Sequence, residues 1–144
     1  MSATPLRARE RGSAYGIVLT TAIVILTLAT AYIHSTLGGM LFTLNALGYV
    51  ALAVAIVIGA TVTLPIVVRF SWLPRIALFG FTLATMLGWL MMGPRYDMAY
   101  LAKAIEGVLL ALLIVDIYRV YGGPGGMLAE ARASVTELFA SLRR

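Results

Sequence analysis

Long apolar runs separated by short, more polar connections dominate the pattern of this chain. Four runs, at residues 15–33, 41–62, 75–92 and 100–118, are of membrane-spanning length, since about 20 residues cross a hydrocarbon core of about 30 Å. The runs are continuous rather than alternating, and a backbone in lipid must satisfy its own hydrogen bonds, so they predict helices rather than barrel strands. We expect an all-α transmembrane four-helix bundle over residues 15–120.

The first run has a second interpretation as a cleaved signal peptide. Arginines precede it within residues 1–14, and the small-residue motif ATA lies at 29–31. Its apolar stretch is longer than the roughly 7–15 residues of a signal-peptide core. We therefore favour a membrane-spanning helix.

The pattern changes after the sequence GGPGG, within a predicted linker at residues 121–126. Glycine and proline make a continuous helix unfavourable there. In residues 127–144 apolar positions recur at spacings of three and four, which predicts an amphipathic helix of about four turns. This helix either lies on the inner membrane surface, the interpretation we favour, or pairs with a partner protein through its apolar stripe.

Composition agrees with a membrane protein of one domain. Hydrophobic residues make up 61% of the chain and charged residues 12%, whereas soluble domains carry about 25% charged residues. The net charge is +5, but the basic residues lie at span ends rather than on one face, which argues against a nucleic-acid partner.

The distribution of basic residues predicts an orientation. Nine of the eleven lysines and arginines lie on the side of the two termini, and only Arg95 and Lys103 lie on the other side. Basic residues accumulate in cytoplasmic segments, so both termini are expected in the cytoplasm, with residues 1–14 as a basic cytoplasmic segment.

Small residues at four-residue spacing predict close helix packing, because helices in lipid associate by fit rather than by hydrophobicity. We expect the stripes to pack within the bundle; the alternative is packing between two copies. The stripes are Ala51, Ala55 and Gly59 in the second run, Gly80, Ala84 and Gly88 in the third, and Gly107 and Ala111 in the fourth.

Glu106 is the main candidate for a functional group, because an ionisable residue within a span is costly unless it has a role. It is expected about 9 Å inside the fourth span, at 1.5 Å per residue, where Lys103 can pair with it as an (i, i+3) couple. Four other polar residues are expected at the same outer level, close enough to share one pocket: His34, Asn45, Arg95 and Asp97.

Three interpretations of this polar group remain open. Glu106 is either a structural clamp that accepts hydrogen bonds from Lys103 and Asn45, or part of an outward-facing site that exchanges protons or holds a cation. In the second case His34 titrates near neutral pH. The third interpretation is a surface that docks a partner.

Several kinds of chemistry find no support in the sequence. The chain has no cysteine and one histidine, which excludes disulfides, thiolate metal sites and bis-histidine haem within one copy. A single haem or pigment ligand at His34 is less common than an exposed turn histidine, so no metal or cofactor is expected. His34, Asp97 and Glu106 are the only candidate acid–base groups, and no nucleophile accompanies them, so an enzyme ranks third among the functions.

The segments HSTLGGMLFTLNALGYVAL and RYDMAYLAKAIEGVLL resemble stretches of small, uncharacterised four-span bacterial membrane proteins over most of residues 30–120. The resemblance implies a multi-pass protein of the bacterial inner membrane. Small multidrug transporters share the size and a membrane glutamate, but theirs lies in the first span, where this chain has no acid. The expected partners are the lipid bilayer and other membrane subunits or further copies of the chain. We expect an accessory or structural subunit; the alternative is a small proton- or cation-linked transporter or channel.

Overall fold

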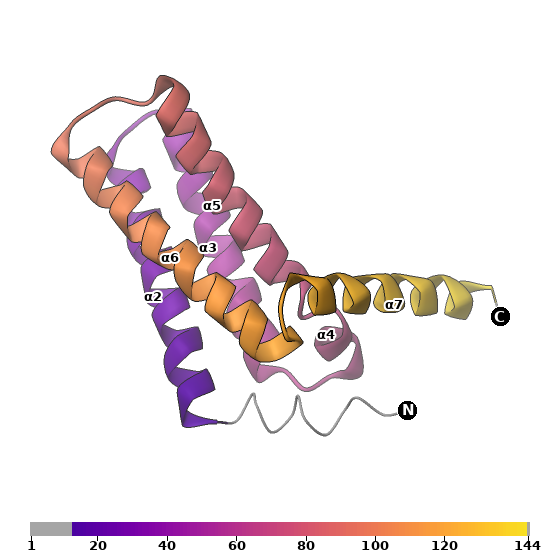
Figure 1. Cartoon of the computed structure of the whole chain (residues 1–144). Coiled ribbons are helices and arrows are strands. Elements are labelled where there is room, and N and C mark those ends of the chain that lie inside the picture. Colours follow the sequence, from indigo (N-terminus) through magenta and orange to yellow (C-terminus); the bar gives the residue numbers. More distant parts are fainter. Residues whose placement is uncertain (1–12, 144) are drawn as a thin grey trace.

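A computed structural model describes residues 13–143, and this part of the chain is helical with no strand (Figure 1). Ser13 caps the first helix by accepting a hydrogen bond from the backbone N–H of Gly16. The helices are α2 (Ala14–Thr36), α3 (Met40–Thr61), α4 (Pro65–Arg69), α5 (Leu73–Met92), α6 (Asp97–Tyr121) and α7 (Pro124–Leu142).

Four of these helices, α2, α3, α5 and α6, are long and apolar enough to span a membrane. They correspond to the four predicted spans, and α6 is longer than predicted at both ends because it starts at Asp97 and continues to Tyr121. The connection between α3 and α5 contains the short helix α4, which was not predicted and begins at a proline whose fixed φ suits a first helical turn.

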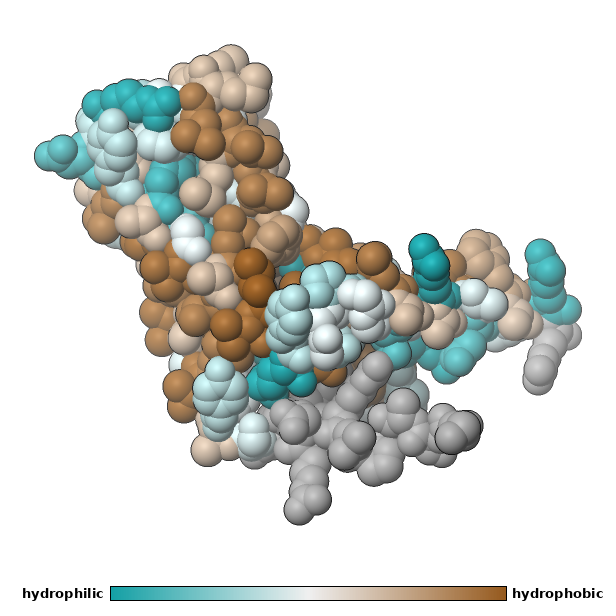
Figure 2. All heavy atoms as spheres, in the orientation of Figure 1, coloured by the Kyte–Doolittle hydropathy of each residue, from teal (hydrophilic) through white to brown (hydrophobic). Residues whose placement is uncertain are grey.

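Helix α2 packs against α3 and α6, and α5 packs against α3 and α6 on the other side. We call the end of the bundle with the short connections 37–39 and 93–96 the hairpin end, and the opposite end the terminal end. The core contains fully buried Leu78, Leu109 and Leu113. Many other apolar side chains face outward, and Figure 2 shows a mostly apolar surface around the middle of the bundle.

The predicted small-residue stripes contribute little to contacts between these helices. Gly59 is buried against α5, as expected, and Ala55 is half-buried. By contrast, a Cβ atom added at Gly80, Gly88 or Gly107 would meet open space. The remaining stripe residues, Ala51, Ala84 and Ala111, are exposed. The prediction of packing within the bundle is therefore wrong for most of the stripes, because those faces of α3, α5 and α6 point outward.

Gly48 of α3 makes a close contact with α5 that was not predicted. A Cβ atom there would lie 2.6 Å from the ring of Phe81. Phe81 in turn makes an edge-on contact with the ring of Tyr49, with centroids 4.9 Å apart. The missing side chain at Gly48 is what allows this aromatic pair to fit between the two helices.

Gly48→Ala is therefore expected to destabilise the bundle by about 1–3 kcal/mol, the usual effect of overpacking. Thermal unfolding in detergent measures it. Gly107→Ala is the matched control, since it adds the same methyl group to a helix at an open position and removes a glycine, so its stability is expected to be equal or higher. A second change, Phe81→Leu, is expected to recover part of the loss; equal stability of the two alanine variants would contradict the account.

The predicted C-terminal helix is present, but the break before it is shorter than the predicted linker. Gly122 and Gly123 take positive φ values of 72° and 119°, and α7 starts at the next residue, Pro124. Helix α7 then extends sideways from the terminal end of the bundle (Figure 1). Two polar contacts join α7 to Arg69 at the end of α4. Ser134 Oγ donates a hydrogen bond to the carbonyl of Arg69, and the Arg69 side chain forms a 2.8 Å ion pair with Glu137.

The apolar stripe of α7 remains exposed on the protein, including Leu128, Val135 and Phe139. These side chains make the helix amphipathic, as predicted from their spacing. Their contact with the membrane surface, or alternatively with a partner protein, stays a prediction.

Candidate functional site

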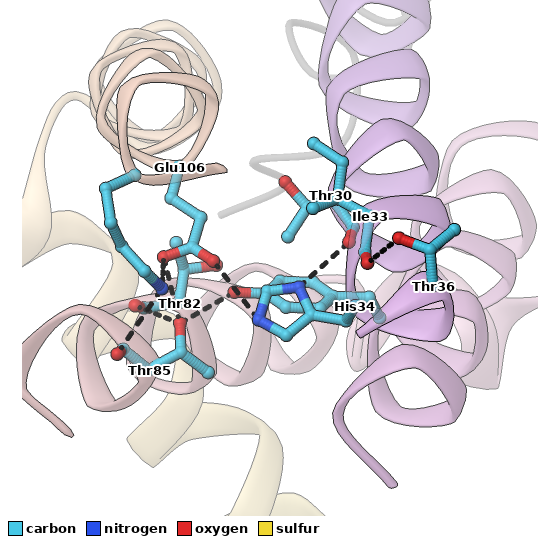
Figure 3. Close-up of polar contacts among 9 residues, drawn as sticks. Thr30, Ile33, His34, Thr36, Thr82, Thr85 and Glu106 are labelled. Atoms are coloured by element: carbon cyan, nitrogen blue, oxygen red, sulfur yellow. Dashed lines mark hydrogen bonds and ion pairs between the residues drawn. The ribbon is translucent and has the colours of Figure 1, made fainter. Parts of the chain in front are cut away.

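The carboxylate of Glu106 lies at the centre of a buried polar cluster formed by α2, α3, α5 and α6 (Figure 3). Its Oε2 atom accepts a 2.6 Å ion-paired hydrogen bond from Lys103 Nζ. The same oxygen lies 3.1 Å from the Thr85 hydroxyl, which is also 2.8 Å from the phenol oxygen of Tyr49. Glu106 and Tyr49 are completely buried. The predicted (i, i+3) pair is therefore present, and it has additional partners on two other helices.

Glu106 lies deeper than predicted. Because α6 starts at Asp97 rather than near Tyr100, Glu106 is about 14 Å along the helix from its first residue instead of about 9 Å. This depth is close to the middle of the 25-residue helix. A charge at that depth costs about 2.5–3.5 kcal/mol on insertion scales, which makes its pairing with Lys103 important for the fold.

His34 faces the other oxygen of this carboxylate. Its Nδ1 atom lies 2.9 Å from the carbonyl oxygen of Thr30, and a carbonyl only accepts hydrogen bonds, so Nδ1 carries the proton. In the neutral ring Nε2 is then an acceptor. Nε2 lies 3.8 Å from Glu106 Oε1, so two acceptors face each other in the neutral state. A proton on Nε2 would turn this contact into an ion pair.

Three buried side-chain oxygens in this region make no hydrogen bond within the described part of the chain: Glu106 Oε1, Thr30 Oγ1 and Thr82 Oγ1. Figure 3 shows Thr30 beside His34 and Thr82 beside Glu106. An unsatisfied buried polar atom costs about 1–3 kcal/mol. Ordered water or a bound hydroxyl group would satisfy such atoms.

A pocket of about 380 Å³ adjoins the cluster. Its polar walls are His34, Asn45, Thr85 and Lys103, and much of the remaining wall is aromatic or aliphatic. It extends to residues of both hairpin-end turns, toward which α5 and α6 separate (Figure 1). Its volume falls in the range of about 300–1,000 Å³ found for small-molecule sites. Glu106 itself is behind the wall formed by its partners.

The structure brings together only part of the predicted polar group. His34, Lys103 and Glu106 meet directly, while Asn45 lines the pocket and makes no side-chain hydrogen bond among residues 13–143. The expected hydrogen bond from Asn45 to Glu106 is absent.

Arg95 and Asp97 were predicted to join the pocket and do not. The Arg95 guanidinium stacks on the Trp89 ring at 4.1 Å and donates to the carbonyl of Leu90. Asp97 is exposed in the first turn of α6, where a negative charge suits the helix dipole. Arg95 is therefore held outside the pocket by its contacts with Trp89 and Leu90, and Asp97 by its exposed position at the start of α6.

Tyr49 and Thr85 were not predicted as site residues. A threonine in a membrane helix commonly donates to a carbonyl of its own helix, as Thr85 does to the carbonyl of Thr82 at 2.8 Å. Its hydroxyl oxygen also lies 3.1 Å from Glu106 Oε2. The carbonyl and the carboxylate both only accept, so the single hydroxyl hydrogen of Thr85 serves one of them at a time. The available signal was a tyrosine in the middle of an apolar span, since a buried phenol usually needs a partner.

A second buried charge cluster lies at the terminal end. Asp116 and Arg119 have the (i, i+3) spacing of a helical ion pair and lie 2.7 Å apart. Arg75 of α5 also contacts Asp116, at 2.7 Å, and donates to the carbonyl of Ser71. Arg75 and Asp116 are at most 4% exposed. This unpredicted pair connects α5 to α6 at the end opposite the Glu106 cluster.

The Glu106 cluster has the elements of a proton site. With neutral His34 the positive charge of Lys103 balances the carboxylate, and a proton on Nε2 would face Glu106 Oε1. Among residues 13–143, no group of three or more His, Cys, Asp or Glu side chains is arranged to hold a metal ion.

No protein-family model matches this chain, and no curated protein or solved structure is significantly similar to it. The resemblance to small four-span bacterial proteins therefore stays a prediction, and function is inferred from the site alone.

Proposed function

We propose that this chain is a small proton-linked membrane transporter in which Glu106 and His34 hold the transported proton. The observation that carries the proposal is the buried Oε1 atom of Glu106, which has no hydrogen-bond partner within residues 13–143 and faces the acceptor nitrogen of His34 at 3.8 Å. Ionisable residues within a span commonly mark proton or substrate pathways.

The surroundings of the cluster support the same function. The pocket gives access from the hairpin end, while the buried leucines Leu78, Leu109 and Leu113 fill the bundle on the other side. A carrier that opens to one side at a time needs such an arrangement. By the positive-inside rule, the hairpin end faces outward and both termini are cytoplasmic, in a bacterial inner membrane.

Proton movement in liposomes tests the proposal. The wild-type protein is expected to accelerate internal acidification several-fold over protein-free liposomes when a pH gradient is imposed and the potential is clamped. Glu106→Gln is expected to abolish this, because an amide cannot take up the proton. Asp97→Asn is the matched control, since it neutralises an exposed carboxylate on the same helix and leaves the cluster intact. Wild-type flux equal to that of empty liposomes, or unchanged flux in Glu106→Gln, would refute the proposal.

The second candidate is an accessory subunit that holds other membrane proteins or further copies of the chain. It is favoured by the open positions at Gly80 and Gly107, where helices of another molecule can approach closely. Light scattering in detergent is expected to give a mass above that of one chain, and Gly107→Leu is expected to reduce it. A monomeric wild-type protein that copurifies with no membrane partner would exclude this function.

A further inference from the structure

We propose that the pocket beside Glu106 binds a neutral, ring-sized molecule that carries a hydroxyl group, such as a phenol, and that this molecule enters from the bilayer. The inference rests on the proposed function, since it names the class of substrate that the proton site would serve. The pocket's volume, its apolar wall and the hydrogen-bonding character of its polar end each restrict the ligand.

The charges at the polar end select a neutral ligand. A cation would compete with Lys103, whose Nζ already lies 2.6 Å from the carboxylate. An anion would find that same lysine neutralised by Glu106, and no other cationic side chain lines the pocket. With His34 neutral, the formal charges of the cluster cancel.

The hydrogen-bonding groups at the polar end of the pocket favour a ligand that donates a hydrogen bond. His34 Nε2 is an acceptor because Nδ1 donates to the carbonyl of Thr30, and Glu106 Oε1 is an acceptor without a partner in the described structure. The His34 side chain lines the pocket, and its Nε2 atom has no donor facing it. A ligand hydroxyl can supply that hydrogen, whereas an ether or ketone has no hydrogen to donate.

The rest of the pocket wall favours a ligand that contains an aromatic ring. The wall's aromatic side chains come from α3, α5 and the turn before α6: Phe42, Phe81, Trp89 and Tyr96. Aromatic rings attract one another in edge-on or offset arrangements. A volume of about 380 Å³ is at the small end of ligand sites, which fits a single ring with a short substituent.

The side of α5 that carries Ala84 and Gly88 provides the route from the bilayer. Both residues line the pocket and are exposed, and Gly88 has open space where a side chain would be. Small residues therefore form the boundary between the pocket and the lipid-facing surface. An apolar molecule dissolved in the bilayer would reach the polar end by passing them.

Binding of two probes that differ by one methyl group tests the inference. 4-Propylphenol donates a hydrogen bond, and its methyl ether, 4-propylanisole, has the same ring and no donor. Fluorescence of Trp89, measured in a Trp72→Phe background in detergent, reports binding because Trp89 lines the pocket. The phenol is expected to bind at least about tenfold more tightly than the ether, the value of one hydrogen bond to a buried acceptor. His34→Phe is expected to remove this preference.

Two glycine variants provide the matched control for the pocket. Gly88→Leu places a side chain on the pocket wall and is expected to weaken phenol binding at least about tenfold. Gly80→Leu adds the same side chain to the same helix at another open position, outside the pocket, and is expected to bind as the parent does.

Equal affinities for the phenol and the ether, or unchanged phenol binding in Gly88→Leu, would overturn the inference. The liposome assay uses no phenol, so the two proposals fail separately. Proton flux without a phenol preference would refute the ligand class and leave the transporter intact. A phenol preference without proton flux would establish the binding site and refute transport.

Discussion

Asp116→Leu is expected to destabilise the bundle by about 3–5 kcal/mol, the typical result of removing one partner of a buried ion pair. The loss follows from the geometry at the terminal end. Arg75 is 4% exposed and would remain inside the bundle without its carboxylate. Arg119, which is 9% exposed at its side chain, would lose the same partner. Thermal unfolding of the purified protein in detergent measures the change.

Asp97→Leu is the matched control, because it removes an exposed carboxylate from the same helix and is expected to change stability by no more than about 0.5 kcal/mol. The double variant Arg75→Met, Asp116→Leu is expected to recover part of the loss, since it leaves no arginine of α5 unpaired. If Asp116→Leu were as stable as Asp97→Leu, the Arg75–Asp116 ion pair would not stabilise the packing of α5 against α6.

Lys103→Met is expected to have an effect of similar size, about 3–5 kcal/mol, because it leaves the fully buried carboxylate of Glu106 without its counterion. The variant keeps the length and apolar stem of the lysine, so the packing around α6 changes little. Loss of thermal stability in detergent, relative to the wild type, is the measured quantity.

Glu106→Gln is expected to behave differently and to fold with nearly wild-type stability. The side-chain amide can donate to Nε2 of His34 where the carboxylate offered a second acceptor. Lys103 lines the pocket and can turn its ammonium group toward it. Combined with Lys103→Met, the glutamine is therefore expected to rescue most of the loss. A destabilised glutamine variant, or a double variant no better than Lys103→Met, would favour a structural clamp over a proton site.

Most of the fold follows from the hydrophobic pattern, because the lengths of the apolar runs directly determine which segments cross a bilayer. The ends of the helices follow from local chemistry that the pattern does not contain. Asp97 and Tyr96 look like turn residues, yet α6 begins there because an acidic residue stabilises a helix N-terminus. Likewise, Pro124 starts α7 directly after two glycines, although the sequence GGPGG suggests a longer break.

The candidate site was predictable only where its members share a helix. Lys103 and Glu106 follow from (i, i+3) spacing. By contrast, Thr85 reaches the carboxylate, and Tyr49 reaches Thr85, because of how α3 and α5 are rotated. Sequence periodicity does not determine that rotation when apolar residues surround a helix on all sides. The same reason explains why Arg75 and Asp116, which are 41 residues apart, were not paired.

Nuclear magnetic resonance of the single histidine tests the central claim most directly, namely that His34 and Glu106 together hold a proton. Because His34 is the only histidine in the chain, ¹⁵N-labelled histidine gives one pair of ring signals. The account predicts a neutral ring protonated on Nδ1, because the carbonyl of Thr30 accepts from that nitrogen, with Nε2 as an acceptor facing Glu106. In Glu106→Gln the Nε2 signal is expected to shift, because the side-chain amide can donate to that nitrogen where the carboxylate cannot. A ring protonated on Nε2, or unchanged ring signals in the glutamine variant, would contradict the claim.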